Sequence, residues 1–76
     1  MGIYPNITGV VKLCKQEGYG FIVPDTMIGA HDKDVLFHAA SLETVDWSKV
    51  QVGQKVRITS VISNRRGLQA NGVSFI

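Results

Sequence analysis

The sequence predicts an all-β fold, a single small barrel of five short strands, and three observations support this. Its 76 residues are too few to divide their apolar side chains between two cores, so residues 1–76 are expected to form one domain. Hydrophobic residues make up 45% of the chain and charged residues 18%, as in ordinary globular proteins. Turn-forming residues separate short runs rich in Val, Ile and Phe, which leaves no room for a long helix.

The first half of the chain contains three of the expected strands. Residues 8–15 form the first, and a turn leads into the second at residues 19–23, which a Pro-Asp pair ends. Residues 26–33 contain Gly, Asp and His and are expected to form a loop. The third strand, at residues 34–38, is short and has alternating side-chain character.

The second half contains the remaining two strands. Residues 39–43 can form one helical turn, which is too short to be stable alone. The fourth strand is expected at residues 55–62, and a hairpin loop at residues 63–67 leads into the fifth at residues 68–75. Alternation in the fourth strand places Val56, Ile58, Ser60 and Ile62 on one face and Lys55, Arg57, Thr59 and Val61 on the other. Since closure removes exposed strand edges, we expect a closed antiparallel barrel of the five-stranded oligonucleotide/oligosaccharide-binding (OB) form.

The residues that carry chemistry argue against several classes of protein. Cys14 is the only cysteine, so no internal disulfide or cysteine-rich metal site can form, and two histidines are too few for a zinc site. No nucleophile–base pair, paired carboxylates or phosphate-binding loop can be assembled, so we expect a protein that is not an enzyme and holds no metal or cofactor. No apolar run approaches the ~20 residues that span a bilayer, and no signal peptide is recognisable. We therefore expect no membrane association and a cytoplasmic location.

The formal net charge of +2 is small, but the charges are unevenly placed along the chain. Every acidic residue lies between Glu17 and Asp46, whereas residues 47–76 contain only basic ones. These are Lys49, Lys55, Arg57, Arg65 and Arg66, and the first strand adds Lys12 and Lys15. If the two ends of the chain meet in the fold, they make a basic side suited to a phosphate backbone. The alternative interpretation is charge that serves solubility alone.

The segment Gly-Tyr-Gly-Phe-Ile at residues 18–22 is the most informative for function. Alternation along a strand puts Tyr19 and Phe21 on one face and Ile22 on the other, and the glycines leave both rings uncovered. Two uncovered neighbouring rings form a stacking platform for bases, worth about 1–3 kcal/mol per base. The alternative is that both rings lie in the core, although Ile22 already fills the interior.

The third strand repeats this pattern. Val35 and Phe37 are expected to face inward, while Leu36 and His38 face outward beside the two rings. An imidazole next to aromatic rings can stack on a base or donate a hydrogen bond to it. The alternative is a His that is structural or merely exposed.

In order and spacing, five segments of the chain resemble the cold-shock domain. The two ribonucleoprotein motifs of that family read Lys-Gly-Phe/Tyr-Gly-Phe-Ile and Val-Phe-Val-His-Phe, and they correspond to residues 18–22 and to Asp-Val-Leu-Phe-His at residues 34–38. The other segments are Thr-Gly-Val-Val-Lys at residues 8–12, Val-Gly-Gln-Lys-Val at residues 52–56 and Arg-Gly-Leu-Gln-Ala at residues 66–70. The resemblance implies an OB barrel whose ligand is single-stranded RNA or DNA.

The chain also departs from the family pattern. Leu-Cys-Lys at residues 13–15 stands where the family has Trp-Phe-Asn, and the connection to the glycine motif is one residue shorter. Glu17 replaces a usual Lys, while Leu36 and Ala39 stand at positions that are usually Phe. Trp47 aligns with a loop Phe that adds a stacking surface in the family, and the alternative for Trp47 is a hydrophobic plug under the long connection.

The resemblance and the residue pattern together give a candidate nucleic-acid-binding site. Its residues are Lys12, Leu13, Lys15, Tyr19, Phe21, Leu36, His38, Trp47, Arg66 and Gln69. We expect a monomeric module that holds RNA or single-stranded DNA unstructured in translation or transcription, and binds more weakly or more selectively than its relatives because stacking partners are missing. The alternative is a protein-interaction module, in which Leu13, Leu36 and Ala39 form an apolar patch for a protein partner.

Overall fold

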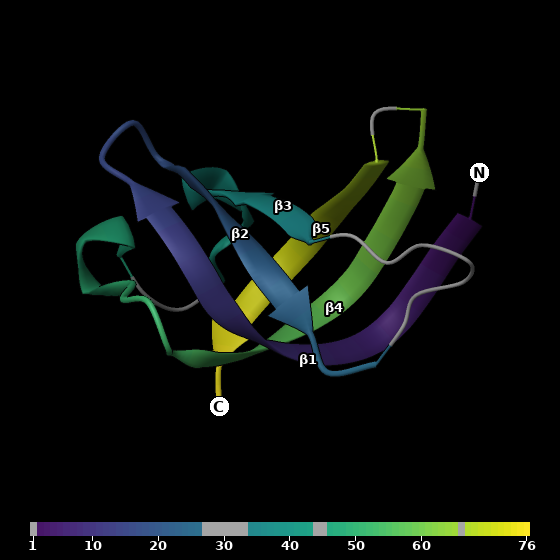
Figure 1. The fold of residues 1–76 in the computed structure, drawn as a ribbon, viewed down its shortest axis with the longest axis horizontal. Helices are drawn as coiled ribbons and strands as arrows, with labels where there is room; N and C mark the ends of the chain where they lie inside the picture. Colours follow the sequence, from purple (N-terminus) through teal and green to yellow (C-terminus); the bar gives the residue numbers. More distant parts are fainter. Residues whose placement is uncertain (1, 27–33, 44–45, 66) are drawn as a thin grey trace.

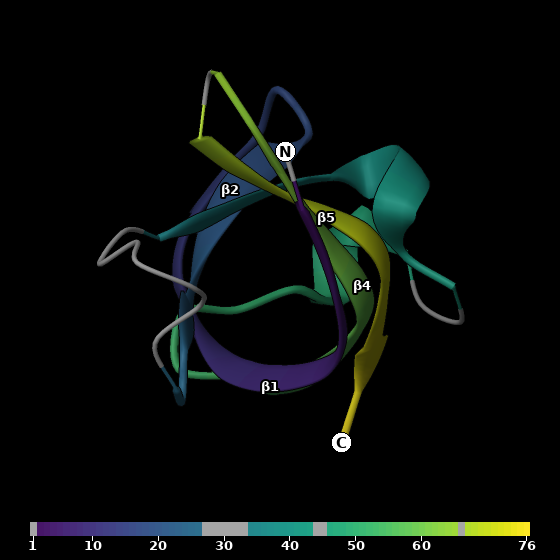
Figure 2. The same cartoon turned by 90° about the vertical axis from the view of Figure 1, so that its right-hand side faces the viewer.

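The computed structural model describes residues 2–26, 34–43, 46–65 and 67–76. These residues form five strands, β1 (Gly2–Lys15), β2 (Tyr19–Pro24), β3 (Val35–His38), β4 (Lys55–Asn64) and β5 (Gly67–Phe75). The strands close into a barrel in the order β1-β2-β3-β5-β4 (Figures 1 and 2). The prediction of an all-β five-stranded barrel is therefore confirmed, although β1 begins at Gly2 rather than at residue 8. No helix in the described part of the chain has the length and apolar character needed to cross a membrane.

The barrel closes through a parallel pair. The ladders β1–β2, β2–β3, β1–β4 and β4–β5 are antiparallel, but β3 and β5 run in the same direction. The expectation of a wholly antiparallel barrel was wrong at this pair, and the reason is topological. Five strands in a ring cannot alternate direction all the way round, so one neighbouring pair must be parallel. Among the described residues this pair is short, with Val35 in register with Leu68 and Leu36 with Gln69.

Two short 3-10 turns lie in the described part of the connection between β3 and β4. The first, η1 (Ala39–Ser41), confirms the helical turn expected after His38. The second, η2 (Trp47–Lys49), was not predicted from the sequence. Together they carry the chain across one end of the barrel before β4 begins (Figure 1).

The core fills the interior of the barrel with aliphatic side chains and one ring. Ile22 from β2 and Val35 and Phe37 from β3 are completely buried, which confirms the alternation predicted for these two strands. The other buried apolar residues are Val11, Val50, Val56, Ile58, Val61, Leu68, Ala70 and Val73. The outward face of β2 and β3 is therefore set by the inward packing of their alternate residues.

In β4 the predicted alternation holds only for the first half of the strand. Val56 and Ile58 face inward, but Val61 is also fully buried, while Ser60 and Ile62 are partly exposed. The inward face therefore changes between Ile58 and Val61, and the expectation for Ser60, Ile62 and Val61 was wrong.

The change of face in β4 begins where both of its ladders are interrupted. In the two ladders that β4 forms, Asn6 of β1, Thr59 of β4 and Gly72 of β5 lie between paired residues but are not themselves in register. Asn6 and Gly72 both have positive φ, 55° and 86°, which departs from regular extended backbone. The Thr59 hydroxyl donates a 2.9 Å hydrogen bond to Oε1 of Glu43, and a Cβ on Gly72 would lie only 2.5 Å from that oxygen. Glycine at position 72 therefore leaves room for this contact.

Candidate nucleic-acid interface

The outward face of the β2–β3 ladder carries the four residues expected there. Tyr19 pairs with His38, and Phe21 pairs with Leu36. Tyr19, Phe21 and Leu36 are half-buried and His38 is exposed, whereas Ile22 and Phe37 between them are buried. Neither Tyr19 nor Phe21 belongs to the apolar residues packed against the core. The structure therefore supports the uncovered-ring interpretation over the core interpretation for both rings.

The neighbouring strands extend this face into two rows of side chains. One row runs across four strands as Leu13, Phe21, Leu36 and Gln69. The other runs across three strands as Lys15, Tyr19 and His38. We refer to these seven residues as the platform. Neighbouring strands lie about 4.8 Å apart, so the rings and the imidazole are close enough to contact successive bases of one strand.

Gly20 lies between Tyr19 and Phe21 on β2 and is buried beneath the platform. Its Cα hydrogens face inward, and a Cβ there would collide with the main-chain oxygen of Leu13, the Phe37 ring and Cα of Cys14. The glycine therefore lets β1 approach β2 closely and makes room for the buried Phe37 ring, so it acts on packing beneath the rings.

A β-bulge in β1 determines where Leu13 lies. The register with β2 shifts between Val11, which is buried, and Leu13, which pairs with Phe21. Strict alternation from Val11 would turn Leu13 inward, and the extra residue, Lys12, turns it onto the platform instead. Cys14 then faces the interior, where its thiol lies 3.7 Å from the main-chain oxygen of Val50.

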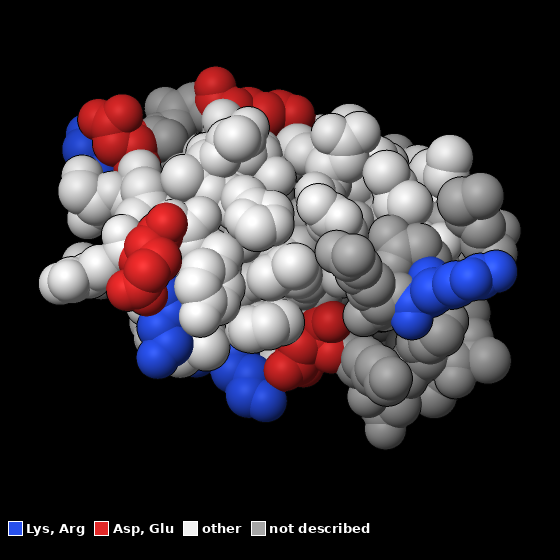
Figure 3. All heavy atoms as spheres, turned by 90° about the horizontal axis from the view of Figure 1, so that it is seen from above, with Lys and Arg blue, Asp and Glu red and all other residues white. Residues whose placement is uncertain are grey.

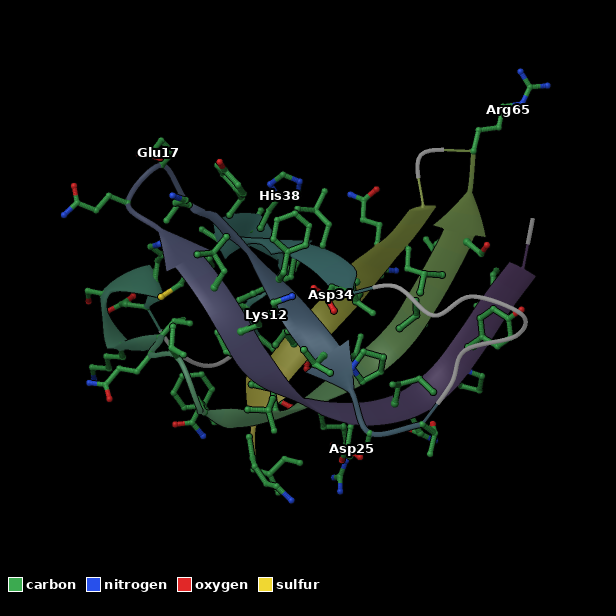
Figure 4. The ribbon with its side chains drawn as sticks, viewed as in Figure 1. Lys12, Glu17, Asp25, Asp34, His38 and Arg65 are labelled. Carbon is green, nitrogen blue, oxygen red and sulfur yellow. The ribbon has the colours of Figure 1, made fainter. Side chains whose placement is uncertain are left out.

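Lys12 lies beside the platform and is held by an acidic partner. Its Nζ is 2.9 Å from Oδ2 of Asp34, the residue that precedes β3 (Figure 4). The lysine side chain is 61% exposed and the aspartate 31%. Sequence analysis placed Lys12 in the site but gave Asp34 no role, because a bridge across β2 depends on the bulge and on the order of strands in the barrel.

Trp47 lies at the barrel end and contacts the platform through the main chain of Lys15. Its indole Nε1 donates a 2.7 Å hydrogen bond to the main-chain oxygen of Lys15, and its ring lies 5.2 Å from the buried Phe37 ring, tilted by 46°. This geometry favours the plug interpretation of Trp47. Arg66, the remaining candidate, lies outside the described residues.

The basic residues that the structure describes are spread over several elements of the fold. The two ends of the chain do meet, because β1 pairs with β4, but Lys55 and Arg57 pair with Val10 and Thr8, away from β2 and β3. Arg65 lies at the tip of the β4–β5 hairpin (Figure 4). Viewed from the side on which His38 lies, the surface is mostly uncharged in the middle, with charged side chains toward its edges (Figure 3). The described basic residues therefore form no basic patch on this face, and the basic side expected from the sequence stays a prediction.

Comparison with protein families shows which family the chain belongs to. The family model of the 'Cold-shock' DNA-binding domain matches residues 7–76, nearly the whole chain. The chain belongs to the cold-shock domain family. This is a family of nucleic-acid-binding domains and not of enzymes, so the chain is a cold-shock module with an OB-like barrel. A comparison with curated proteins found no match.

Proposed function

We propose that this cold-shock domain binds single-stranded RNA or DNA on the platform and holds the strand unpaired in translation or transcription. The observation that carries the proposal is the outward placement of Tyr19 and Phe21 on one strand with His38 opposite Tyr19. Exposed rings on a barrel face are the device by which OB-type domains stack the bases of a single strand.

The platform supplies two kinds of contact to a base. Tyr19 and Phe21 offer ring faces, each worth about 1–3 kcal/mol per stacked base. His38 and Gln69 are exposed at the ends of the two rows and can donate or accept hydrogen bonds at base edges. A base stacked in this way cannot pair with a complementary strand, which is how binding keeps a strand unstructured.

Leu13 and Leu36 make this platform less aromatic than that of the family. They flank Phe21 on both sides in one row, where an aromatic ring would offer a further stacking surface. Each missing ring costs at most about 1–3 kcal/mol of binding, so the binding mode survives while affinity falls.

The test is a titration of labelled six-residue pyrimidine strands, RNA and DNA, read by fluorescence polarisation, with the matching duplex as a control. We expect both single strands to bind and the duplex to bind much more weakly. The double variant Tyr19→Ala/Phe21→Ala should abolish measurable binding, whereas Val52→Ala, at an exposed apolar residue that is not part of the platform, should leave it unchanged. Absence of binding by the wild-type domain at low salt would contradict the proposal. It would favour the alternative, a protein partner on the patch of Leu13, Leu36 and Ala39.

A further inference from the structure

The Lys12–Asp34 contact is the one ion pair within the described residues, and it lies at the edge of the platform. Lys12 comes from β1 and Asp34 from the start of β3, so the pair reaches across β2. Val11 and Val35, the neighbours of the two charged residues, both pair with Ile22 of β2. The ammonium and the carboxylate therefore meet across β2 at the level of Ile22, whose outward neighbours on the strand are Phe21 and Val23.

We propose that, in the unbound domain, the Asp34 carboxylate forms the contact with the Lys12 ammonium that a phosphate of the bound strand would otherwise form. Asp34 thereby limits the affinity of the platform for single strands. This inference rests on the proposed function and assigns Asp34 a role that opposes binding. A carboxylate and a phosphate both accept charge-assisted hydrogen bonds from an ammonium at about 2.7–2.9 Å, so they compete for the same donor.

The exchange is energetically accessible because the ion pair is exposed. Exposed ion pairs contribute little to stability, so a phosphate can displace the carboxylate or share the ammonium with it. In either case the negative charge of Asp34 stays close to the incoming phosphate and opposes it. Lys12 is thus partly neutralised by Asp34, and it adds less electrostatic affinity than an unpaired lysine at the same position would.

Salt dependence gives this competition a measurable signature. Each phosphate neutralised on a single strand contributes a slope of about −0.7 to the logarithm of the binding constant against the logarithm of the salt concentration. With Asp34 in place, Lys12 contributes only part of such a step. Without the carboxylate, Lys12 contributes a full one.

The chain offers a matched control for the change in net charge. Asp25, just after the end of β2, is an exposed aspartate whose Oδ2 accepts a 2.8 Å hydrogen bond from the Thr8 hydroxyl. Unlike Asp34, it forms no ion pair with any cation among the described residues. Figure 4 shows Asp25 at the end of β2 farthest from Glu17, while Asp34 points toward Lys12. Asp34→Asn and Asp25→Asn therefore change the net charge equally, and only the first frees Lys12.

The experiment compares wild type, Asp34→Asn, Asp25→Asn, Lys12→Gln and Lys12→Gln/Asp34→Asn in titrations with a labelled six-residue pyrimidine strand at several salt concentrations. We expect Asp34→Asn to tighten binding by up to about fivefold at low salt, as release of an exposed ion pair allows, and to steepen the salt slope by up to about 0.7. Asp25→Asn should give a smaller gain without that change in slope. In the Lys12→Gln background the effect of Asp34→Asn should fall to the size of the Asp25→Asn effect.

Three results would overturn the inference: weaker binding by Asp34→Asn, an effect equal to that of Asp25→Asn, or an unchanged effect in the Lys12→Gln background. Thermal melting of each variant verifies that it is folded. If wild type binds and Tyr19→Ala/Phe21→Ala does not, while Asp34→Asn gives no gain, only this inference fails. If wild type does not bind at any salt concentration, the proposed function fails and this inference fails with it.

Discussion

The indole Nε1 of Trp47 donates a hydrogen bond to the main-chain oxygen of Lys15, the residue that pairs with Tyr19 across the β1–β2 ladder. Trp47 therefore reaches the platform only through the backbone at the end of β1. Its ring contacts Phe37, which lies beneath the platform. The geometry makes Trp47 an anchor for the strand end and for the long connection.

Replacing Trp47 with Leu separates anchoring from stacking. The change keeps an apolar side chain but removes the ring and the indole donor, so we expect the free energy of unfolding to fall by about 1–3 kcal/mol. Binding of a labelled strand to the folded variant should change by less than about twofold, because Trp47 is not expected to stack on a base. The loss of a stacking partner would instead cost about 1–3 kcal/mol of binding free energy, a far larger change. Polarisation titrations and thermal melts measure both quantities. A binding loss of tenfold or more would show that Trp47 stacks on a base.

The two rings of β2 are expected to contribute to binding more than to stability. Tyr19→Ala or Phe21→Ala should weaken single-strand binding by about 1–3 kcal/mol each, because each removes one stacking surface. The loss of stability should be well below the ~3–5 kcal/mol that accompanies truncation of a buried Phe. Phe37→Ala, at a completely buried ring, serves as the comparison and should show that larger loss. Unchanged binding together with a strongly lowered melting temperature would contradict the platform assignment of Tyr19 and Phe21.

Restoring aromatic residues beside Phe21 should tighten binding. Leu13→Trp and Leu36→Phe each add a ring to the row that contains Phe21. The gain for each should be smaller than the ~3 kcal/mol maximum for one stacked base, since neighbouring sites couple. The same titrations measure it. Undetectable binding by both variants would indicate that this face serves a protein partner.

Glu17→Lys is the electrostatic counterpart of these aromatic changes. Glu17 is exposed in the turn between Lys15 and Tyr19, so a positive charge there adds attraction to the phosphate backbone. This gain should disappear at high salt, because exposed charges more than about 3 Å apart are largely screened at 1 M. The gains from Leu13→Trp and Leu36→Phe should largely persist there. Loss of the aromatic gains at the same rate as the Glu17→Lys gain would contradict a stacking contribution.

Gly72→Ala should destabilise the fold more than a second glycine substitution with similar backbone geometry. A Cβ at position 72 would lie 2.5 Å from the Glu43 carboxylate and 2.8 Å from the Thr59 hydroxyl, and it would break their contact. Gly53 has a similar φ of 93°, but a Cβ added there would meet no atom within 4 Å, so Gly53→Ala carries only the backbone cost of about 1–2 kcal/mol. Chemical denaturation should show a larger loss for Gly72→Ala. Equal losses would mean that position 72 accommodates a side chain beside Thr59 and Glu43.

Alternation of apolar residues in the sequence was sufficient to predict which side chains face the core wherever a strand is short and regular. It placed Ile22, Val35 and Phe37 inside the barrel and Tyr19 and Phe21 outside, because a two-residue period leaves no other choice once the apolar residues face the core. It failed for Val61, since the change of face in β4 coincides with an interruption of both of its ladders, beside Asn6 and Gly72. No local pattern in β4 records that interruption.

The bulge at Lys12 and the contacts of Trp47 were also beyond sequence reasoning, for a different reason. Both depend on which segments lie side by side in the closed barrel: Asp34 across β2 from Lys12, and Lys15 at the end where the long connection crosses. Leu13 was placed on the correct face through the family resemblance, whereas strict alternation alone would have turned it inward.

The short parallel pair between β3 and β5 also bears on how the domain folds and opens. It joins Val35 to Leu68 and Leu36 to Gln69, residues from opposite halves of the chain, so its formation requires the closure of a long loop. A ladder so short, between segments so distant in sequence, is the natural place for local opening, because two register pairs among the described residues form it. Leu36 and Gln69 are neighbours in one row of the platform, and a strand stacked along that row would lie across the opening edge. Nucleic acid would then act as a clamp that selects the closed barrel and stabilises it by about 2.7 kcal/mol at a ligand concentration one hundred times Kd.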